Sequence, residues 1–349
     1  MKVVAFRGPR TLEVGQAPDP EPAAGEVVVA VAYCGICGSD LHEYLAPRET
    51  PSPRALGLWS PVMGHELTGV VSAVGQGVSG LKEGDAVVVN PGDACRECFY
   101  CRQQRYNLCA NPHHGIGYTR SGGYAEYVAL RATQAVPLPG KSSLRYGALS
   151  EPFGVAIHGL NRGGLQQGES VFIAGGGPIG LLTLLGARHK NAGTVIVSEP
   201  APPRRELAKQ LGADLVLDPT ADDLAAKVRE HTGGLGAELA VECVGTPKPM
   251  ADCIAATRKG GRIVVAGAFD RPYQTDLLQL LLQEHSIIGT FGSSTELEEA
   301  AQLISSGAVD VGPVVSSVIG LDDVPRTFAE LVADRGSHEK VLVAPNGGL

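Results

Sequence analysis

Three residues of different types that could bind one metal ion lie in the N-terminal part of the sequence. They are the thiol of Cys37, the imidazole of His65 and the carboxylate of Glu66; Ser39 and His42 follow the thiol closely. Zinc prefers ligands of these kinds, and a catalytic zinc keeps one position open, whereas a structural zinc has four protein ligands. We therefore expect an open, catalytic zinc site here. The alternative is a buried histidine–glutamate pair without a metal.

Four more cysteines follow one another at spacings that suit a second zinc ion. They are Cys95, Cys98, Cys101 and Cys109. Four thiolates complete a tetrahedral site and leave no position for a substrate, so this zinc would be structural. It would hold together a lobe with few apolar residues. Free or disulfide-bonded cysteines are one alternative, and a zinc ribbon that binds nucleic acid is another.

A glycine-rich segment further along the chain predicts a dinucleotide site. Residues 171–174 are typical of a buried strand and residues 181–189 of a helix, and a G-x-G-x-x-G motif lies between them. The glycines let the backbone approach a pyrophosphate, whose charge the N-terminus of the helix would meet. Glu199 ends the next predicted strand, where a carboxylate can accept hydrogen bonds from an adenosine ribose. The motif residues expected at the cofactor are Gly175, Gly177, Pro178 and Gly180.

The chain is long enough for two domains. It has 349 residues, of which 44% are hydrophobic. Up to about residue 150, short apolar runs alternate with glycine-rich turns, which is typical of a mostly β, barrel-like domain. Strand and helix patterns then alternate, which predicts a doubly wound parallel sheet and an α/β fold class. We expect a catalytic β domain formed by residues 1–153 and 293–349 and a dinucleotide-binding domain formed by residues 154–292.

The expected elements follow from these patterns. The strands predicted in the first domain are 27–32, 67–74, 86–90 and 125–129. The strands predicted in the second domain are 171–174, 194–198, 215–217, 239–243, 262–266 and one opening at 287, and its helices are 181–189, 204–211, 222–231 and 250–257. Helices at 295–305 and 324–334 precede a closing strand at 340–344, which is expected to return to the first domain. The proline-bearing segment 46–61 is either a wall of the substrate pocket or a surface insertion.

Charge and hydropathy exclude several classes of protein. The net charge is −8 and no run of Lys or Arg forms a phosphate-binding stripe, so nucleic-acid binding is not expected. The longest uncharged run, 170–187, contains five glycines and a proline and is not expected to cross a membrane. The N-terminal residues do not resemble a secretory signal. We therefore expect a cytoplasmic protein.

The motifs together resemble the zinc-dependent medium-chain alcohol dehydrogenases over essentially the whole chain. They are CGICGSDLHEYL at 34–45, MGHE at 63–66, the four-cysteine segment, SEP at 150–152 and GGGPIGL at 175–181. The sequence is most similar to the polyol branch, and within it to (R,R)-2,3-butanediol dehydrogenase and sorbitol dehydrogenase; Glu151-Pro152 departs from the Asp-Pro of threonine dehydrogenases. The resemblance implies a GroES-like β domain, a Rossmann domain, and a homodimer or homotetramer.

The same resemblance implies roles for individual residues. Cys37, His65 and Glu66 match ligands of the catalytic zinc, and Glu151 matches a carboxylate near its fourth position. Either Glu66 or Glu151 is the carboxylate ligand, because the relatives differ on this point. Ser39 and His42 match the hydroxyl and imidazole of a proton relay. The positions that match cofactor contacts are Ile179, Glu199, Arg204, Ala266, Gly267, Ala268, Thr290 and Phe291.

The expected function is hydride transfer between a secondary alcohol, or the corresponding ketone, and NAD. Small vicinal diols such as 2,3-butanediol are the first candidate substrates, polyols such as sorbitol the second, and simple secondary alcohols the third. Two zinc ions per chain and NAD are the expected cofactors, and the reaction would take place in the cleft between the two domains. The alternatives are an NADP-dependent enzyme, a zinc-free reductase of the same fold, and a non-catalytic regulatory module that binds zinc and a dinucleotide.

Overall fold

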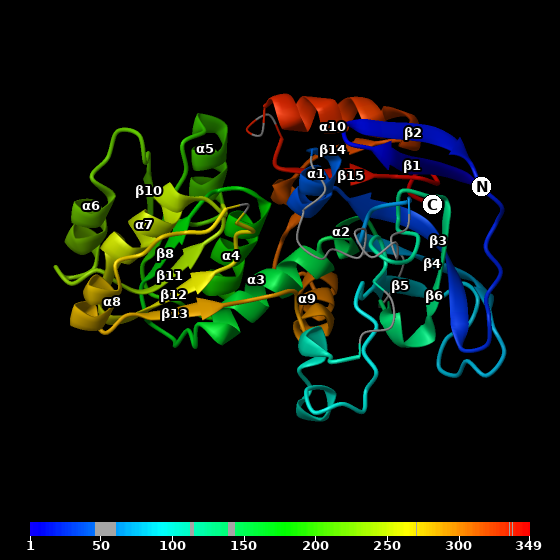
Figure 1. Ribbon diagram of the computed structural model, residues 1–349, viewed down its shortest axis with the longest axis horizontal. Coiled ribbons are helices and arrows are strands. Elements are labelled where there is room, and N and C mark those ends of the chain that lie inside the picture. Colours follow the sequence, from blue (N-terminus) through cyan, green and yellow to red (C-terminus); the bar gives the residue numbers. More distant parts are fainter. Residues whose placement is uncertain (46–60, 112–114, 139–143, 270, 335, 337) are drawn as a thin grey trace. The chain divides into compact units, whose positions relative to one another are not determined.

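The computed structural model describes residues 1–45, 61–111, 115–138, 144–269, 271–334, 336 and 338–349 (Figure 1). The chain forms two compact units, one made of Met1–Glu151 and Leu297–Leu349 and the other of Pro152–Glu296. Most of the predicted segment 46–61 lies outside the described residues. Within the described part of the chain, none of the helices combines the length and apolar character that a membrane crossing requires.

The first unit is built on a seven-stranded sheet. Its strand order is β14-β15-β3-β4-β5-β7, and β6 pairs with β3. The strands are β3 (Glu26–Gly35), β4 (Glu66–Val74), β5 (Ala86–Val89), β6 (Tyr127–Arg131), β7 (Ala135–Pro137), β14 (Val315–Ile319) and β15 (Lys340–Val343). A separate antiparallel hairpin joins β1 (Lys2–Gly8) to β2 (Thr11–Gln16). The predicted return of the closing strand to this unit is confirmed, because β15 pairs with β3.

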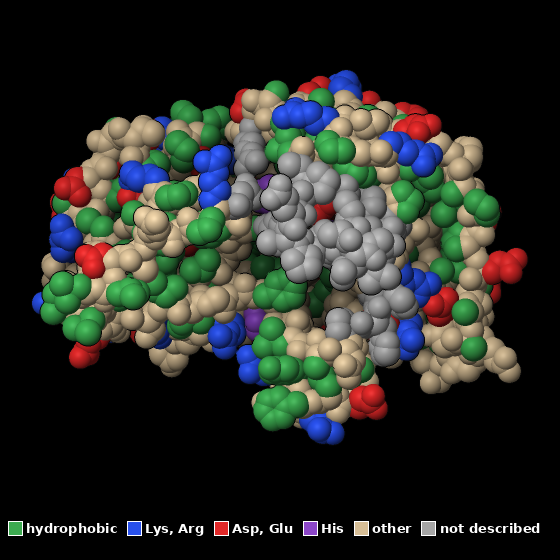
Figure 2. All heavy atoms as spheres, viewed as in Figure 1, with side chains coloured by type: hydrophobic (Ala, Val, Ile, Leu, Met, Phe, Trp, Pro, Cys, Tyr) green, Lys and Arg blue, Asp and Glu red, His purple; other side chains and the backbone are tan. Residues whose placement is uncertain are grey.

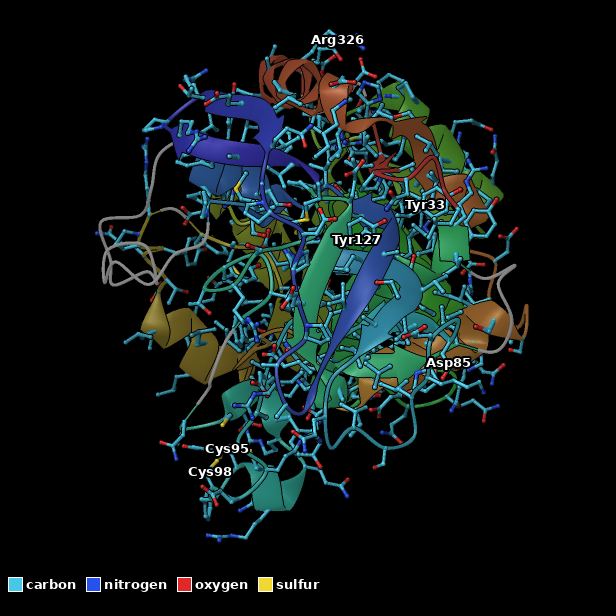
Figure 3. The ribbon with its side chains drawn as sticks, turned by 90° about the vertical axis from the view of Figure 1, so that its right-hand side faces the viewer. Tyr33, Asp85, Cys95, Cys98, Tyr127 and Arg326 are labelled. Atoms are coloured by element: carbon cyan, nitrogen blue, oxygen red, sulfur yellow. The ribbon has the colours of Figure 1, made fainter. Side chains whose placement is uncertain are left out.

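Helices and a lobe complete the first unit. The helices are α1 (Gly38–Leu45), α2 (Leu144–Gly147), α9 (Glu296–Ser305), which begins at the unit boundary, and α10 (Val324–Ala333). The valines of β3 and β4 form a core with Tyr124 and with Phe328 of α10. The four-cysteine segment contains only the short turns η1 (Cys101–Gln103) and η2 (Tyr106–Leu108). Figure 3 shows Cys95 and Cys98 in this lobe, away from the strands that carry Tyr33 and Tyr127.

The second unit contains a six-stranded parallel sheet. The strand order is β10-β9-β8-β11-β12-β13, and each neighbouring pair is parallel. This order reverses direction between β8 and β11, and ligands bind beyond the carboxyl ends of the strands at such a point. The strands are β8 (Val171–Ala174), β9 (Val195–Ser198), β10 (Leu215–Leu217), β11 (Ala237–Glu242), β12 (Thr257–Val265) and β13 (Ser286–Gly289).

Helices alternate with these strands. They are α3 (Ser150–Arg162), which crosses the unit boundary, α4 (Pro178–His189), α5 (Pro202–Gln210), α6 (Leu224–His231), α7 (Pro247–Ala256) and α8 (Leu277–Gln283). All residues of β8 and β9 are buried, as expected for parallel strands covered on both faces. The predicted strands 171–174 and 215–217 are confirmed at their bounds.

Two helices of this unit were not predicted. The helix signal of α3 in the sequence is weakened by Pro152, Gly154 and Gly159. Pro152 is nevertheless compatible with the helix, because it lies in the first turn, where the missing N–H costs no hydrogen bond. In α8 four of the five leucines are exposed, so its apolar residues do not mark a face turned to the core. Its signal was Asp276, whose carboxylate accepts hydrogen bonds from the N–H groups of Leu278 and Gln279 as an N-cap.

Candidate functional site: two metal-ligand groups and a glycine-rich turn

Sheet pairing in the first unit brings together the three residues of the predicted open zinc site. Gly35, the last residue of β3, lies opposite Glu66, the first residue of β4. Cys37 follows the end of β3 and His65 precedes β4, so both side chains lie at the same end of this strand pair. The Cys37, His65 and Glu66 ligand atoms all lie within 4.8 Å of one another. A thiolate, an imidazole and a carboxylate at this separation fit the ligand preferences of zinc.

A buried aspartate orients the imidazole. Asp40, on α1, is 3% exposed, and its Oδ1 lies 3.6 Å from His65 Nδ1. Its Oδ2 accepts hydrogen bonds from the Tyr124 hydroxyl at 2.7 Å and from the Cys37 N–H at 3.0 Å. Burial raises the pKa of Asp40, but the adjacent imidazole and these hydrogen bonds outweigh burial and hold that pKa below its ordinary value. The carboxylate thus faces Nδ1, which leaves His65 Nε2 for a metal.

A buried lysine neutralises the carboxylate of Glu66. Lys340, at the start of β15, is 2% exposed; its Nζ donates to both Glu66 oxygens, at 2.8 and 2.7 Å, and to the Ile36 carbonyl at 3.0 Å. Burial lowers the pKa of Lys340, but the Glu66 carboxylate more than compensates, so the ammonium stays charged. Glu66 therefore has a cationic partner within its own unit, and a metal would share this carboxylate with Lys340.

Ser39 and His42 both lie on α1, three positions apart, and therefore on one side of the helix. The Ser39 hydroxyl lies 3.4 Å from the Tyr118 hydroxyl, which is also 3.4 Å from His65 Nε2. Tyr118 was not predicted as a site residue, because a lone tyrosine in a glycine-rich turn carries no spacing signal.

Glu151, the second carboxylate candidate, lies near the start of α3 and outside the group of three. Burial raises its pKa to about 7, with an opposing contribution from His65. The structure therefore groups Glu66, and not Glu151, with Cys37 and His65. Whether Glu151 also binds the metal stays a prediction.

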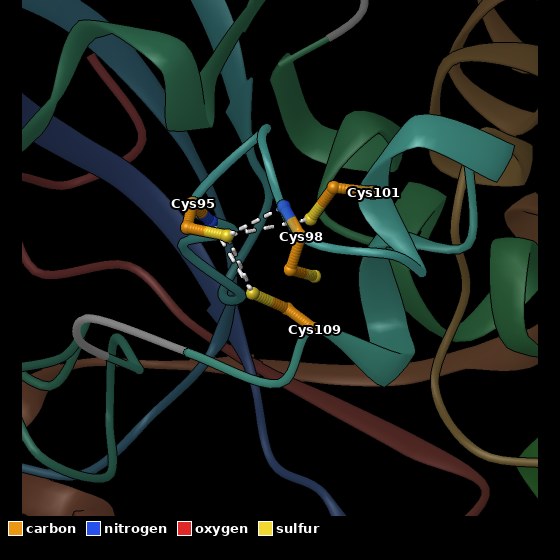
Figure 4. A group of neighbouring side chains, drawn as sticks. All are labelled: Cys95, Cys98, Cys101 and Cys109. Carbon is orange, nitrogen blue, oxygen red and sulfur yellow. Dashed lines mark hydrogen bonds between the residues drawn. The ribbon is translucent and has the colours of Figure 1, made fainter.

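The four cysteines of the lobe converge as predicted (Figure 4). Cys95 Sγ lies 3.9 Å from Cys101 Sγ and 3.5 Å from Cys109 Sγ, and all eight cysteines of the chain are free thiols, which rules out the disulfide alternative. Backbone N–H groups of Cys98 and Ala110 donate to Cys95 Sγ and Cys98 Sγ. The hydrogen bond from Ala110 is the main cause that lowers the pKa of Cys98 to about 6. Four converging sulfurs that accept N–H donors fit a structural zinc.

The glycine-rich turn of the second unit has the geometry that its sequence predicts. Gly175 adopts φ +106°, and a Cβ at Gly180 would lie 1.8 Å from the Gly175 carbonyl oxygen, so both positions require glycine. Gly177 is the N-cap of α4, and Pro178 and Ile179 form its first turn. The N–H groups at this helix end can therefore meet a phosphate.

Glu199 lies against this turn. It is 5% exposed, its Oε2 accepts from the Gly176 N–H at 2.7 Å, and its Oε1 accepts from the Ala201 N–H at 2.9 Å. Arg205 pairs with Asp218 at 2.9 Å, whereas Arg204 Nη1 would lie 3.8 Å from a Cβ at Gly177. Arg204 is therefore the arginine beside the turn.

The remaining predicted cofactor residues follow adjacent strands. Ala266, Gly267 and Ala268 come after β12, and Thr290 and Phe291 come after β13, which pairs with β12. The N–H groups of Ala266 and Gly267 both donate to the Glu242 carbonyl at 2.9 Å. All these segments lie at the carboxyl edge of the parallel sheet, as does the glycine-rich turn after β8.

A buried carboxylate at this edge was not predicted. Glu242, the last residue of β11, is fully buried, and its Oε1 accepts from the N–H groups of Val244 and Gly245 at 2.8 Å. Burial raises its pKa. The signal in the sequence was an acid directly after the apolar run 239–241.

A doubly wound sheet with a glycine-rich turn, together with a cysteine, histidine and glutamate ligand set, defines the zinc-dependent oxidoreductases. Comparison with known proteins agrees: residues 178–306 match the zinc-binding dehydrogenase family and residues 23–140 match the alcohol dehydrogenase GroES-like domain. The chain belongs to the zinc-binding, medium-chain alcohol dehydrogenase family. The predicted family and fold class are thereby confirmed.

Characterised relatives include polyol and diol dehydrogenases. The chain is 30% identical to sorbitol dehydrogenase of Bacillus subtilis, over 99% of this chain and 98% of the relative. It is 32% identical to (R,R)-butanediol dehydrogenase of Neisseria gonorrhoeae, over 99% of this chain and 100% of that protein. A solved zinc-binding dehydrogenase of Sinorhizobium meliloti 1021, bound to NADP, superposes with a TM-score of 0.90 at 32% identity and 99% coverage of both chains.

Proposed function

We propose that the chain oxidises secondary alcohols to ketones with NAD as the hydride acceptor, with vicinal diols as the first candidate substrates and polyols as the second. The observation that carries this proposal is the convergence of Cys37, His65 and Glu66 within 4.8 Å. The names of the relatives, which include butanediol and sorbitol dehydrogenases, support the substrate class.

The chemistry explains why such a site needs a metal. An alcohol with a pKa of about 16 costs on the order of 12 kcal/mol to deprotonate at pH 7, at about 1.4 kcal/mol per unit. A zinc ion held by the three ligands would act as a Lewis acid that supplies most of this free energy. The residues of the chain then have two tasks. Asp40 and Lys340 hold the imidazole and the carboxylate in place, and the Ser39 hydroxyl takes the proton, which His42 on the same helix passes to water.

NAD is the proposed dinucleotide because of the charge beside the glycine-rich turn. The Glu199 carboxylate lies where a ribose is expected, and at close range it would repel a 2′-phosphate by roughly 4 kcal/mol per charge pair at an effective dielectric near 20. Arg205 is paired with Asp218, and Arg204, which lies beside the turn, would offset part of this repulsion. The NADP found in the relative from Sinorhizobium meliloti makes the comparison of the two cofactors necessary.

A metal assay followed by a substrate panel tests the proposal. We expect two zinc ions per chain, and turnover of butane-2,3-diol, sorbitol and butan-2-ol in that order of kcat/KM with NAD. With butane-2,3-diol, kcat/KM should be at least roughly tenfold higher for NAD than for NADP, which corresponds to about 1.4 kcal/mol. A preference for NADP would contradict the cofactor assignment, and no turnover of any alcohol with either dinucleotide would contradict the function.

We also propose that the chain forms a homodimer or homotetramer, which requires a surface for self-association. Leu277, Leu278, Leu281 and Leu282 of α8 are 61–71% exposed, and Figure 2 shows hydrophobic side chains gathered over this helix. The nearby strand β13 is the last of its sheet, so its outer edge can pair with the same strand of a second copy. The variant Leu278→Glu should shift the mass measured by light scattering towards the monomer, whereas the exposed variant Leu235→Glu should not. An unchanged mass for Leu278→Glu would contradict this surface.

A further inference from the structure

The phenol of Tyr118 lies between the proposed relay hydroxyl and the metal-ligand imidazole. Tyr118 Oη is 3.4 Å from Ser39 Oγ and 3.4 Å from His65 Nε2. The Tyr118 and His65 rings pack with their centroids 5.0 Å apart and their planes inclined by 32°. The Tyr118 hydroxyl therefore faces Nε2, the nitrogen that Asp40 leaves available for a metal.

Close backbone packing holds the Tyr118 turn against the residues that precede His65. A Cβ at Gly117 would lie 2.7 Å from the Gly64 carbonyl oxygen, and a Cβ at Gly122 would lie 2.2 Å from the same atom. The Gly64 carbonyl also accepts a hydrogen bond from the Gly123 N–H at 2.8 Å. Because glycine is required at these contacts, the turn and the His65 backbone form one rigid arrangement that positions the phenol.

Two further features leave this hydroxyl able to bind a ligand. The contacts of Tyr118 Oη with Ser39 Oγ and His65 Nε2, both 3.4 Å, are longer than strong hydrogen bonds. Tyr118 is only partly buried, in contrast to Tyr124, which is fully buried and donates to Asp40 at 2.7 Å. The phenol O–H can donate a hydrogen bond to an oxygen of a ligand.

We propose that the Tyr118 hydroxyl binds the second oxygen of a vicinal diol and that Tyr118 thereby distinguishes vicinal diols from simple secondary alcohols. Adjacent oxygens of a diol lie about one hydrogen-bond length apart, which matches a pair of hydroxyl groups such as those of Ser39 and Tyr118. Ser39 serves the hydroxyl on the carbon that is oxidised, and Tyr118 serves the neighbouring hydroxyl. A simple secondary alcohol has no second oxygen, so it cannot form this hydrogen bond with the phenol. This inference rests on the proposed function and adds the residue that selects the substrate.

The variant Tyr118→Phe removes the hydroxyl and keeps the ring that packs on His65. The matched control is Tyr127→Phe, which removes a phenol hydroxyl on β6 of the same unit, at a position opposite Ala30 of β3 (Figure 3). For the wild type and both variants, kcat/KM is measured with NAD for butane-2,3-diol and butan-2-ol, which have the same carbon skeleton. Calorimetry without dinucleotide gives the Kd of each alcohol for the zinc-loaded protein, and a metal assay checks that two zinc ions remain.

We expect Tyr118→Phe to lower kcat/KM for the diol and to weaken diol binding by about tenfold, the effect of one neutral hydrogen bond. For butan-2-ol, both kcat/KM and Kd should change less than about twofold in Tyr118→Phe. Tyr127→Phe should leave both quantities unchanged for both alcohols. An equal loss for both alcohols, or no loss for either, would overturn the role of Tyr118. If the wild type oxidises neither alcohol, the proposed function fails, and the calorimetric comparison still decides whether Tyr118 binds the diol.

Discussion

The two metal-ligand groups of the first unit are built in opposite ways. The cysteines of the lobe lie within one short segment, and the contact between Cys95 and Cys109 spans only 14 positions. The Cys37 group depends on segments that are far apart: Tyr118 meets Ser39 across 79 positions, and Lys340 meets Glu66 across 274. The lobe uses one residue type, whereas the other group mixes ligand types, and the charged side chains of Asp40 and Lys340 contact its ligands.

This difference follows from what each group has to do. Four thiolates complete a tetrahedral shell, so the metal itself can fix the positions of the cysteines. Three ligands do not complete a shell, and the protein must hold each of them in place so that the open position keeps its shape. The supporting residues can come from any part of the fold, and in this chain they come from α1, the turn at Gly115–Arg120 and β15.

The largest expected effect comes from removing the thiolate of the Cys37 group. Cys37→Ser should lower kcat/KM by roughly a thousandfold or more, because a Lewis acid contributes several kcal/mol and each 1.4 kcal/mol is a factor of ten. The metal assay should show one zinc ion lost and the lobe zinc retained, with an unchanged circular dichroism spectrum. Full turnover with one zinc ion per chain would refute the proposed role of this group.

Removing one cysteine of the lobe should lower the stability of the fold. Cys98→Ser removes one of four ligands, and loss of a structural metal belongs to the changes that cost about 4 kcal/mol or more. Thermal unfolding should occur at a lower temperature, and limited proteolysis should cut between residues 95 and 109. Arg102→Ala, at an exposed position of the same lobe, is the control. If Cys98→Ser kept its zinc and its resistance to protease, the lobe would not depend on the metal.

Removing the buried ammonium of Lys340 should further distinguish the Cys37 group from the four cysteines of the lobe. Lys340→Met leaves the Glu66 carboxylate buried without its partner, which costs about 3–5 kcal/mol. The loss should be smaller in zinc-loaded protein than in chelator-treated protein, because the metal supplies the missing positive charge. Lys2→Met breaks an ion pair with Asp322 at the surface and should cost less than about 1 kcal/mol. Equal losses with and without zinc would show that Glu66 does not face the metal.

A smaller effect is expected from Asp40, which faces the ligand His65 in the Cys37 group. Asp40→Asn keeps the shape of the side chain but removes the charge that faces His65, so zinc affinity at this group should fall about 10–100-fold. Competition with a chelator measures this affinity, and zinc bound by the four cysteines of the lobe should be unaffected, because Asp40 does not contact that group. An unchanged affinity would show that the charge of Asp40 is not needed to orient the imidazole.

The smallest effect tests a buried carboxylate, Glu296, that belongs to neither metal-ligand group. Burial raises the pKa of Glu296, but hydrogen bonds from His158, Ser294 and Asn161 outweigh burial and bring it to about 2. Because the folded-state pKa lies below the ordinary value of about 4.3, the charged carboxylate stabilises the fold above that pH, and the stabilisation is lost as the pH falls from about 4.3 towards 2.

Urea unfolding of chelator-treated protein measures this contribution without interference from zinc. Glu296→Gln should lower the free energy of unfolding by about 2 kcal/mol at pH 6, and the difference from the wild type should shrink below about pH 4. A difference that stayed constant down to pH 3 would mean that the contribution of Glu296 to stability does not depend on its charge.

The sequence revealed the features that depend on local spacing. The lobe cysteines, the glycine-rich turn and the strands β8 and β10 follow directly from residue patterns within short segments. Cys37, His65 and Glu66 were identified as candidate ligands, but their meeting depends on the pairing of Gly35 with Glu66. No pattern within the segment 37–66 indicates this pairing by itself.

The supporting residues could not be predicted because tertiary contacts define them. Asp40 reads as an ordinary first-turn acid of a helix, Tyr118 as a residue of a glycine-rich turn, and Lys340 as the first residue of a strand. Only the folded chain brings their side chains to His65 and Glu66. The helix α8 was missed for a related reason, since its exposed leucines break the rule that apolar residues face a core.

The pairing of Lys340 with Glu66 also sets an order of events during synthesis. A ribosome that adds about 5–20 residues per second needs roughly 14–55 s to reach Lys340 after Glu66, a separation of 274 positions. The lobe cysteines emerge together, within seconds, and can capture zinc while translation continues. The four cysteines of the lobe are therefore all available long before Lys340 can neutralise the Glu66 carboxylate.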